Sequence, residues 1–186
     1  MARFWLSLLL AVSLLAPSLA DGKRKYGIHG HKAPKLNVGT WFNLPKGKKS
    51  IDLPELRGKV VYLLFFQSWC PACHSHGLPR MKKLVREYEK KDVVFLVIQT
   101  VFEGYAVNTP AKAEATRKQF GLDIPVGHDG GPERSRVMRR YRTGGTPWVV
   151  VIDKEGIVRF DDYFLANPAA RKLLDRLGKE QHSENI

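Results

Sequence analysis

A seven-residue apolar run that leads directly into a pair of cysteines constrains this chain more than any other feature. The run, Val60–Phe66 (VVYLLFF), is unbroken and rich in β-branched and aromatic residues. Such a run predicts a strand that is buried on both faces of a sheet. Gln67 and Ser68 end the run, and residues 73–90, rich in Lys, Arg, Glu and Leu, have the composition of a helix. The sequence therefore predicts a buried strand, a turn and a helix in direct succession.

The first cysteine, Cys70, lies at the predicted N-terminus of this helix. Pro71 suits the first helical turn, where its missing N–H would have no partner in any case. Free N–H groups and the positive end of the helix dipole favour a negative charge there. We therefore expect a lowered pKa for the Cys70 thiol, which makes Cys70 the nucleophile. Cys73, one helical turn later, is placed to attack the mixed disulfide and release the substrate.

The same segment also fits other chemistry. Cys70-Pro-Ala-Cys73-His74 is the attachment signature of a c-type haem, for which Met81 and Met138 could supply a second axial ligand. A copper metallochaperone could use the two thiols with His74, and two cysteines can form a purely structural disulfide. A structural zinc site needs four ligands, and the chain has two cysteines, so no metal is expected to be resident. The buried strand ahead of the cysteines favours a redox-active dithiol over these alternatives.

At Trp69-Cys-Pro-Ala-Cys73, directly after a hydrophobic strand, the chain resembles the thioredoxin superfamily. Two flanking segments, LPELRGKVV at 53–61 and GTPWVVVIDKEG at 145–156, resemble its exported TlpA/ResA-type, redoxin-like branch. The resemblance covers residues 41–178. It implies an α/β thioredoxin-like fold, with a central mixed sheet flanked by helices and an N-terminal strand extension. It also implies an enzyme that exchanges disulfides with protein thiols and disulfides, with the Cys70–Cys73 disulfide in place of a cofactor.

The resemblance also implies roles for residues around the dithiol. Pro147 would be a cis-proline that faces the two cysteines, and Thr146 would offer its backbone to an extended substrate segment beside Cys70. Trp69 and Pro71 would shape the site. A glycine pair before Thr146 allows a tight turn, and an X-Pro bond is the one type in which the cis form is common.

Three further residues are candidates for proton transfer or for tuning the thiol pKa. His74 and His76, as cations, would stabilise a thiolate on the cysteines. Glu103 follows the next buried strand, at the edge of the sheet where the dithiol should lie, and could assist proton transfer from Cys73. Many relatives carry an acidic residue soon after the second cysteine, where this chain has His76, so the proton acceptor is not assigned.

Four segments are expected along the chain. Residues 1–20 have the pattern of a secretory signal peptide, with a basic start at Arg3 and a small-residue cleavage pattern ending at Ala20. An uncleaved membrane anchor is the alternative. Residues 21–37 are predicted to be a flexible basic arm, 38–178 the thioredoxin-like domain and 179–186 a polar tail. His29 and His31 in the arm could chelate a metal, although a solvated pair is the simpler interpretation. We expect export to the periplasm.

The formal net charge of +13 is spread over the chain and is not gathered in one segment. An exported protein seldom meets nucleic acid, so we expect no nucleic-acid partner. Contact with a membrane is expected only through an uncleaved signal segment. The positive charge would attract acidic partners.

The remaining elements are predicted from hydrophobic periodicity and from the positions of Gly and Pro residues. Pro79 should kink or break the first helix. His128 and Asp129 could approach the dithiol, but nothing local requires it. The other predicted elements are an edge strand at 38–44, a strand at 93–99, a helix at 110–120, a short strand from 124, a basic helix at 132–141, hairpin strands at 148–152 and 157–161 and a last helix from 167 to 178.

The Cys70-Pro-Ala-Cys73 motif does not indicate the direction of electron transfer, because Ala72 is typical of neither a reductant nor an oxidant. The helix dipole and His74 favour the reduced form, whereas the resemblance implies a dedicated reductase that serves cytochrome c or copper-site maturation and draws on an upstream redox partner. We give the resemblance more weight than these local effects in predicting the direction of electron transfer. We predict a reductant with a potential between about −180 and about −270 mV.

Overall fold

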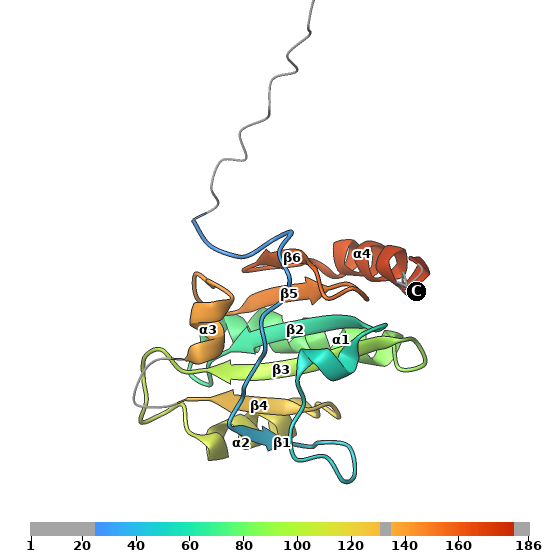
Figure 1. The fold of residues 1–186 in the computed structure, drawn as a ribbon. Helices are drawn as coiled ribbons and strands as arrows, with labels where there is room; N and C mark the ends of the chain where they lie inside the picture. Colours follow the sequence, from blue (N-terminus) through green and yellow to red (C-terminus); the bar gives the residue numbers. More distant parts are fainter. Residues whose placement is uncertain (1–24, 131–134, 181–186) are drawn as a thin grey trace, which may run out of the picture.

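The computed structural model describes residues 25–130 and 135–180; the predicted signal peptide and nearly all of the predicted tail lie outside the described residues. Six strands form one mixed sheet in the order β1-β4-β3-β2-β5-β6 (Figure 1). The strands are β1 (Thr40–Phe42), β2 (Val60–Phe66), β3 (Val93–Thr100), β4 (Val126–Asp129), β5 (Trp148–Ile152) and β6 (Val158–Asp162).

The predicted strand at Val60–Phe66 is confirmed as β2, and it occupies the centre of the sheet. It pairs in parallel with β3 and antiparallel with β5. All of its residues are buried. Because successive side chains point to opposite faces, β2 contributes to both hydrophobic cores of the molecule.

The two faces of the sheet are covered differently. The helices α1 (Leu78–Glu87), α2 (Pro110–Phe120) and α4 (Asn167–Lys179) pack against one core, in which Leu64, Leu84 and Leu174 meet. The opposite face is covered by the N-terminal segment, a 3₁₀ helix at Leu53–Leu56 and α3 (Arg136–Arg140). The thioredoxin-like fold with a mixed sheet between helices is therefore as predicted.

The segment predicted to be a flexible arm is instead packed in its described part, residues 25–37. It first pairs with β6, where the N–H of Gly30 donates to the carbonyl of Val158 at 2.8 Å and the N–H of Val158 donates to the carbonyl of His31 at 2.9 Å. It then crosses the face of the sheet to β1, as the blue trace of Figure 1 shows. Leu36 is fully buried on this path. The composition of the segment is polar, but a few buried residues and backbone bonds hold it in place.

The first helix begins with an irregular turn. Residues 73–77 form a π-helical turn, in which the N–H of Leu78 donates to the carbonyl of Cys73. Pro79 has no N–H to bond within a regular α-helix, and a π turn is one way to absorb this defect without a break. The predicted kink is thus a change of hydrogen bonding, and the α-helix ends at Glu87, earlier than the predicted residue 90.

Two other predicted elements are shorter in the structure. The edge strand predicted at 38–44 is limited to Thr40–Phe42, and it ends there because the next residue, Asn43, has a positive φ angle of 55°. Such a conformation cannot continue a strand. The basic helix predicted at 132–141 is confined to Arg136–Arg140 within the described residues, with Ser135 as its N-cap.

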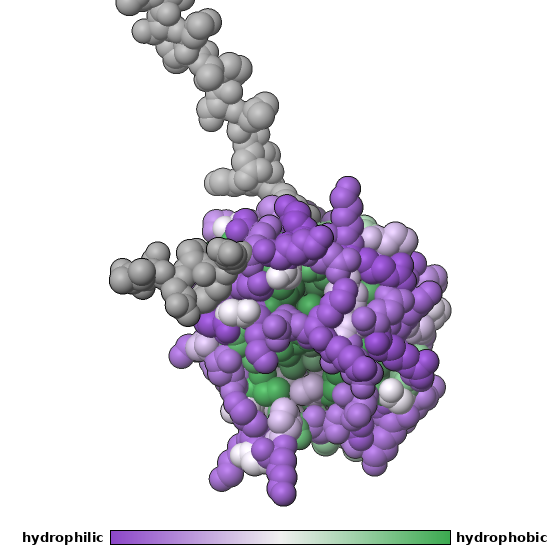
Figure 2. Space-filling model, turned by 90° about the vertical axis from the view of Figure 1, so that its right-hand side faces the viewer, coloured by the Kyte–Doolittle hydropathy of each residue, from purple (hydrophilic) through white to green (hydrophobic). Residues whose placement is uncertain are grey.

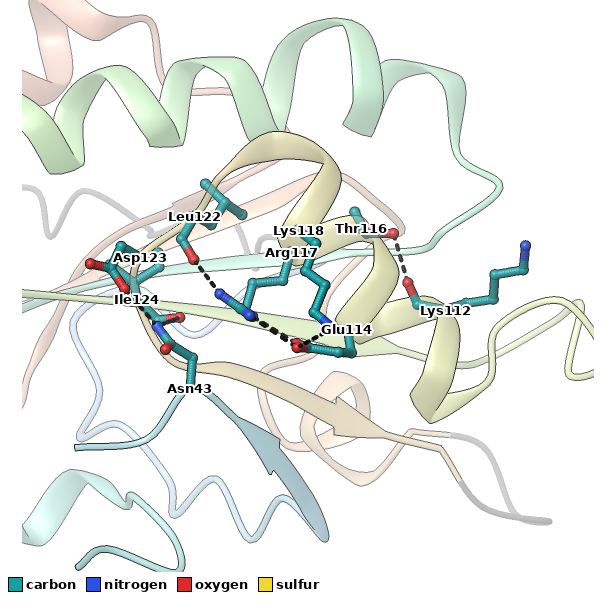
Figure 3. Close-up of polar contacts among 9 residues, drawn as sticks. All are labelled: Asn43, Lys112, Glu114, Thr116, Arg117, Lys118, Leu122, Asp123 and Ile124. Atoms are coloured by element: carbon teal, nitrogen blue, oxygen red, sulfur yellow. Dashed lines mark hydrogen bonds and ion pairs between the residues drawn. The ribbon is translucent and has the colours of Figure 1, made fainter. Parts of the chain in front are cut away.

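Side-chain bonds fix α2 to the strands at the sheet edge (Figure 3). Arg117 donates to Glu114 through Nε at 2.6 Å and Nη2 at 2.9 Å, and its Nη1 donates to the carbonyl of Leu122 at 3.3 Å. Asn43 donates to Asp123 and to the carbonyl of Ile124, both at 3.2 Å. The ion pair with Arg117 lowers the pKa of the Glu114 carboxyl. These contacts hold the start of β4 and the end of β1 against the helix.

The end of the sheet where the parallel strands begin carries an apolar hollow of about 400 Å³. Ile51, Val94, Phe95 and Ile124 line it. Figure 2 shows recessed apolar surface framed by polar side chains on this face. None of the helices within residues 25–130 and 135–180 is long and apolar enough to span a membrane.

Candidate active site: the Cys70–Cys73 disulfide

The two cysteines form a disulfide at the junction between β2 and the first helix, with their Cα atoms 5.3 Å apart. They follow the C-terminal end of β2 and therefore lie at the edge of the sheet where the parallel strands end. Cys70 is 5% exposed and Cys73 is fully buried. Cys70 is therefore the more accessible of the two cysteines.

Backbone amides of the helix N-terminus are aimed at Cys70. The N–H of Cys73 donates to the Cys70 sulfur at 3.2 Å. The N–H groups of Cys73 and His74 also donate to the carbonyl of Cys70, at 3.1 and 3.3 Å. An amide donor favours a negative sulfur over a neutral one. The arrangement favours a thiolate on Cys70 once the disulfide is reduced.

A second chain segment lies across from the disulfide. The Thr146–Pro147 peptide bond is cis, the form that the resemblance implies. The carbonyl oxygen of Thr146 lies 3.5 Å from the Cys70 sulfur. Gly77 in the π turn lies so close to this segment that an added Cβ would be 3.0 Å from the Cβ of Pro147. The cysteines, Thr146 and Pro147 are thus brought together although Cys70 and Thr146 are 76 positions apart in the sequence.

Two tyrosines support the loop that carries Thr146. A Cβ added at Gly144 would be 2.6 Å from the Tyr163 hydroxyl and 3.0 Å from the Tyr26 ring. Tyr163 in turn packs edge-on against Trp148, with ring centroids 4.8 Å apart. The glycine therefore permits close contact with aromatic rings from the arm and from the segment after β6. Sequence reasoning assigned the glycine to a tight turn and missed both tyrosines.

The loop before the cysteines is held by a buried amide that sequence reasoning also missed. Asn108 accepts a hydrogen bond from the N–H of Ser68 at 2.8 Å and donates to Gln67 Oε1 at 3.0 Å. Gln67 Oε1 also accepts from the indole N–H of Trp69 at 2.7 Å. Trp69 itself is 47% exposed and lies over Gly104. Asn108 thus fixes the conformation of the turn that presents Trp69 and Cys70.

A second polar chain leads from the same turn to β4. Gln99 donates to the Ser68 hydroxyl, and its Oε1 contacts Nδ1 of His128 at 2.5 Å. Burial lowers the pKa of His128, while the nearby Asp129 acts in the opposite direction. His128 therefore approaches the site through Gln99 rather than by contact with the cysteines. The sequence feature that could have indicated this polar chain is Gln99, a glutamine near the end of an otherwise apolar strand.

Within the described residues, none of the three side chains proposed for proton transfer forms a hydrogen bond with either cysteine. His74 packs edge-on against Phe120 with centroids 5.3 Å apart, and its Nε2 is buried without a partner within the described residues. His76 is exposed, with its Nδ1 2.6 Å from the Ser75 hydroxyl. Glu103 is exposed and lines a hollow that contains neither cysteine.

Pro71 is exposed at the start of the helix, next to Cys70. His29 in the arm is 3.1 Å from the carbonyl of Arg159, and His31 is exposed. No group of three or more His, Cys, Asp or Glu is gathered as metal ligands in the part of the chain that the structure describes.

A mixed sheet whose central strand ends at a disulfide facing a cis-proline defines a thioredoxin-like protein. The redoxin family matches residues 28–167, and the chain belongs to this family. The ResA thiol-disulfide oxidoreductase of Bacillus cereus (strain ATCC 10987 / NRS 248) is 32% identical over 151 residues, which cover 79% of this chain and 82% of the relative.

Other relatives match over different lengths. ResA of Bacillus thuringiensis (strain Al Hakam) is 33% identical over 113 residues, which are 61% of this chain and 59% of the relative. The chain thus matches less than two thirds of that protein. A thiol-disulfide isomerase from Corynebacterium glutamicum has a similar structure, with a TM-score of 0.71, 30% identity, and coverage of 80% of this chain and 98% of that chain. A crystal structure of a thioredoxin-like superfamily protein gives a TM-score of 0.75 at 32% identity, covering 81% of this chain and 98% of that chain.

Proposed function

We propose that this protein is an exported thiol–disulfide oxidoreductase that reduces disulfides in protein clients. The observation that carries the proposal is the amide of Cys73 directed at the Cys70 sulfur, 3.2 Å away, at the start of a helix. Family membership supports the same class of reaction. Export rests on the predicted signal peptide, and the reducing direction rests on the family resemblance.

In the reaction, the Cys70 thiolate of the reduced protein attacks a client disulfide, and one client sulfur leaves as a thiolate. Cys73, after losing its proton, then attacks Cys70 in the mixed disulfide and releases the second client sulfur. Two electrons pass to the client, and the protein returns to the Cys70–Cys73 disulfide. Thr146 and cis-Pro147 would form the surface along which the client segment lies, with Trp69 and Pro71 at its side.

Trapping experiments test these roles. Cys73→Ser should accumulate mixed disulfides with clients in an extract of the export compartment, because attack survives and resolution is lost. In the reduced wild-type protein, Cys70 should be alkylated near neutral pH much faster than the buried Cys73. Adducts that form with Cys70→Ser and not with Cys73→Ser would reverse the assignment.

The reduction potential tests the direction. A value between about −180 and about −270 mV is expected of a weak to moderate reductant. A value near about −120 mV would make the protein an oxidant. The client class, which the resemblance suggests to be cytochrome c or copper-site maturation, would be identified from the trapped adducts. Tight stoichiometric Cu(I) binding by the reduced protein, without insulin reduction, would instead indicate a copper metallochaperone.

A further inference from the structure

A cationic hollow lies between the loop after β3 and the segment that leads to Thr146, and it has no role in the reaction described above. It measures about 540 Å³, and its walls include Lys25, Arg139, Arg142, Glu103 and Thr143. Three cations therefore face one carboxylate. Within the described residues, none of the three cations forms an ion pair, and the side chain of Arg139 makes no hydrogen bond. Three cations against one carboxylate leave an excess of positive charge among the described lining residues, which makes the hollow a site for an anion.

The hollow is formed by the two loops that flank the disulfide. One wall continues from Glu103 to Gly104, where an added Cβ would be 3.2 Å from the indole nitrogen of Trp69. The other wall contains Thr143, three residues before Thr146, whose carbonyl is 3.5 Å from Cys70. The three residues from Thr143 to Thr146 span at most about 10 Å. A polypeptide bound along Thr146 therefore reaches the hollow about three residues from its own reacting cysteine.

The lining suits a side chain that combines an apolar stem with a negative end. Phe102 and Met138 contribute apolar surface to the hollow. Thr143 is 8% exposed, and its hydroxyl is buried without a hydrogen-bond partner within the described residues. A carboxylate in the hollow offers an acceptor for that hydroxyl and a counter-charge for Arg139. Among the described lining residues, Glu103 is the one carboxylate that a lysine or arginine would meet.

We propose that this hollow binds an acidic side chain of the client polypeptide, about three residues from the cysteine that Cys70 attacks. The proposal rests on the proposed function and adds a client class to it, namely disulfides with a nearby Glu or Asp. The arrangement selects clients by charge at a point separate from the reacting sulfurs.

Matched peptides provide the test. Each is a symmetrical disulfide of a peptide with one cysteine and with Glu, Gln or Lys three residues away, placed on either side in separate peptides. The reduced protein is mixed with each peptide in stoichiometric amounts, and the rate of peptide-thiol release is measured. Each reaction converts one protein dithiol and one peptide disulfide into one protein disulfide and two peptide thiols, so no other reductant is needed.

The wild-type protein should react with the Glu peptide about fivefold faster than with the Gln peptide, and slowest with the Lys peptide. Arg139→Gln should abolish the Glu preference, and Arg139→Glu should reverse it toward Lys. Thr143→Val should weaken it without reversing it. Arg86→Gln is the matched control, since Arg86 is an exposed residue on α1, about 20 Å along the helix from Cys73.

Equal rates with the Glu and Gln peptides would overturn the proposal while leaving the proposed function intact. An equal loss of preference in Arg139→Gln and Arg86→Gln would also overturn it, because the effect would then belong to the overall charge. Failure of every peptide to react would count against the proposed function itself. Unchanged circular dichroism of the variants would confirm that they are folded.

Discussion

At the residue scale, the turn before Cys70 depends on amide side chains that are themselves buried. Asn108 is 2% exposed and Gln67 fully buried. Besides its bonds to Ser68 and Gln67, Asn108 donates to the carbonyls of Glu103 and Gly104, both at 3.1 Å. One side chain thus ties the loop after β3 to the turn after β2. Both ends of the Asn108 amide have partners, and a buried polar group that is satisfied in this way specifies one conformation.

Asn108→Ala should therefore destabilise the protein by about 2 kcal/mol, because the Ser68 N–H and the Gln67 side chain lose a buried partner. The free energy of unfolding in urea measures this. Trp69 loses its support as well, so its fluorescence should shift toward that of a more exposed indole. A change in stability below about 0.5 kcal/mol, the size usual for surface substitutions, would mean that the amide network does not hold the turn.

His128 gives the protein a predictable pH dependence. Its folded-state pKa is lowered by burial, so the unfolded chain takes up a proton near pH 6.5 while the folded protein stays neutral. The unfolded state then binds more protons, and stability falls as the pH drops below about 6.5. His128→Gln removes this contribution. Between pH 6.5 and 5, the variant should lose stability less steeply than wild type, by at most about 1.4 kcal/mol per pH unit.

His31→Gln is the control for this measurement, because His31 is exposed. Its unfolding free energy should follow the wild-type pH profile. Parallel profiles for wild type and His128→Gln would show that the buried histidine titrates alike in the folded and unfolded states.

At the scale of elements, the sequence predicted the strands and motifs that depend on local residue patterns. It did not predict the features that depend on contacts between distant segments. Both ends of β2 were predicted correctly, because an unbroken apolar run of this length forms a strand buried on both faces. The Thr146-Pro147 segment was identified from a short local motif. The π turn at 73–77 was not foreseen, since it depends on Pro79 and on close contact between Gly77 and Pro147. The Asn108 and Gln99 contacts join residues about 40 and 30 positions apart, which no local pattern encodes.

Gly77→Ala tests the contact between the π turn and the cis-proline segment. The added methyl group would be 3.0 Å from Pro147 Cβ, so one of the two segments must move. We expect a loss of about 1 kcal/mol in stability and slower reaction with a peptide disulfide, because the cysteines and Thr146 move apart. Urea unfolding and thiol release are the two measurements.

Gly178→Ala is the matched control, because Gly178 lies in α4 with nothing within 4 Å of an added Cβ. This substitution should stabilise the helix by about 0.5–1 kcal/mol and leave the reaction rate unchanged. If Gly77→Ala is stabilising to the same extent, the contact with Pro147 places no constraint on the site.

At the scale of the whole molecule, the N-terminal segment completes the second core. Residues 25–37 are mostly polar and show no hydrophobic periodicity. Ala33 and Leu36 are nevertheless buried against the face of the sheet that α1, α2 and α4 leave uncovered. The hydroxyl of Tyr141 donates to the carbonyl of Pro34 at 2.8 Å, and burial raises the pKa of that tyrosine. The domain predicted to begin at 38 therefore also includes residues 25–37.

Leu36→Ala should destabilise the protein by about 2–5 kcal/mol, the usual effect of deleting a fully buried leucine side chain. Lys35→Ala, at the exposed neighbouring position, should change stability by less than about 0.5 kcal/mol. Thermal or urea unfolding compares the two. Similar small effects from both would mean that the segment detaches in solution and that the core ends at β1.

The pairing of this segment with β6 also bears on self-association. A strand at the border of a sheet exposes unpaired N–H and C=O groups that can recruit a strand from another molecule. Residues 30–33 occupy such groups on Gly156 and Val158. A chain that lost this cover would present part of its border strand as a template for intermolecular β-pairing. The segment therefore protects the folded protein against aggregation at the same time as it fills the core.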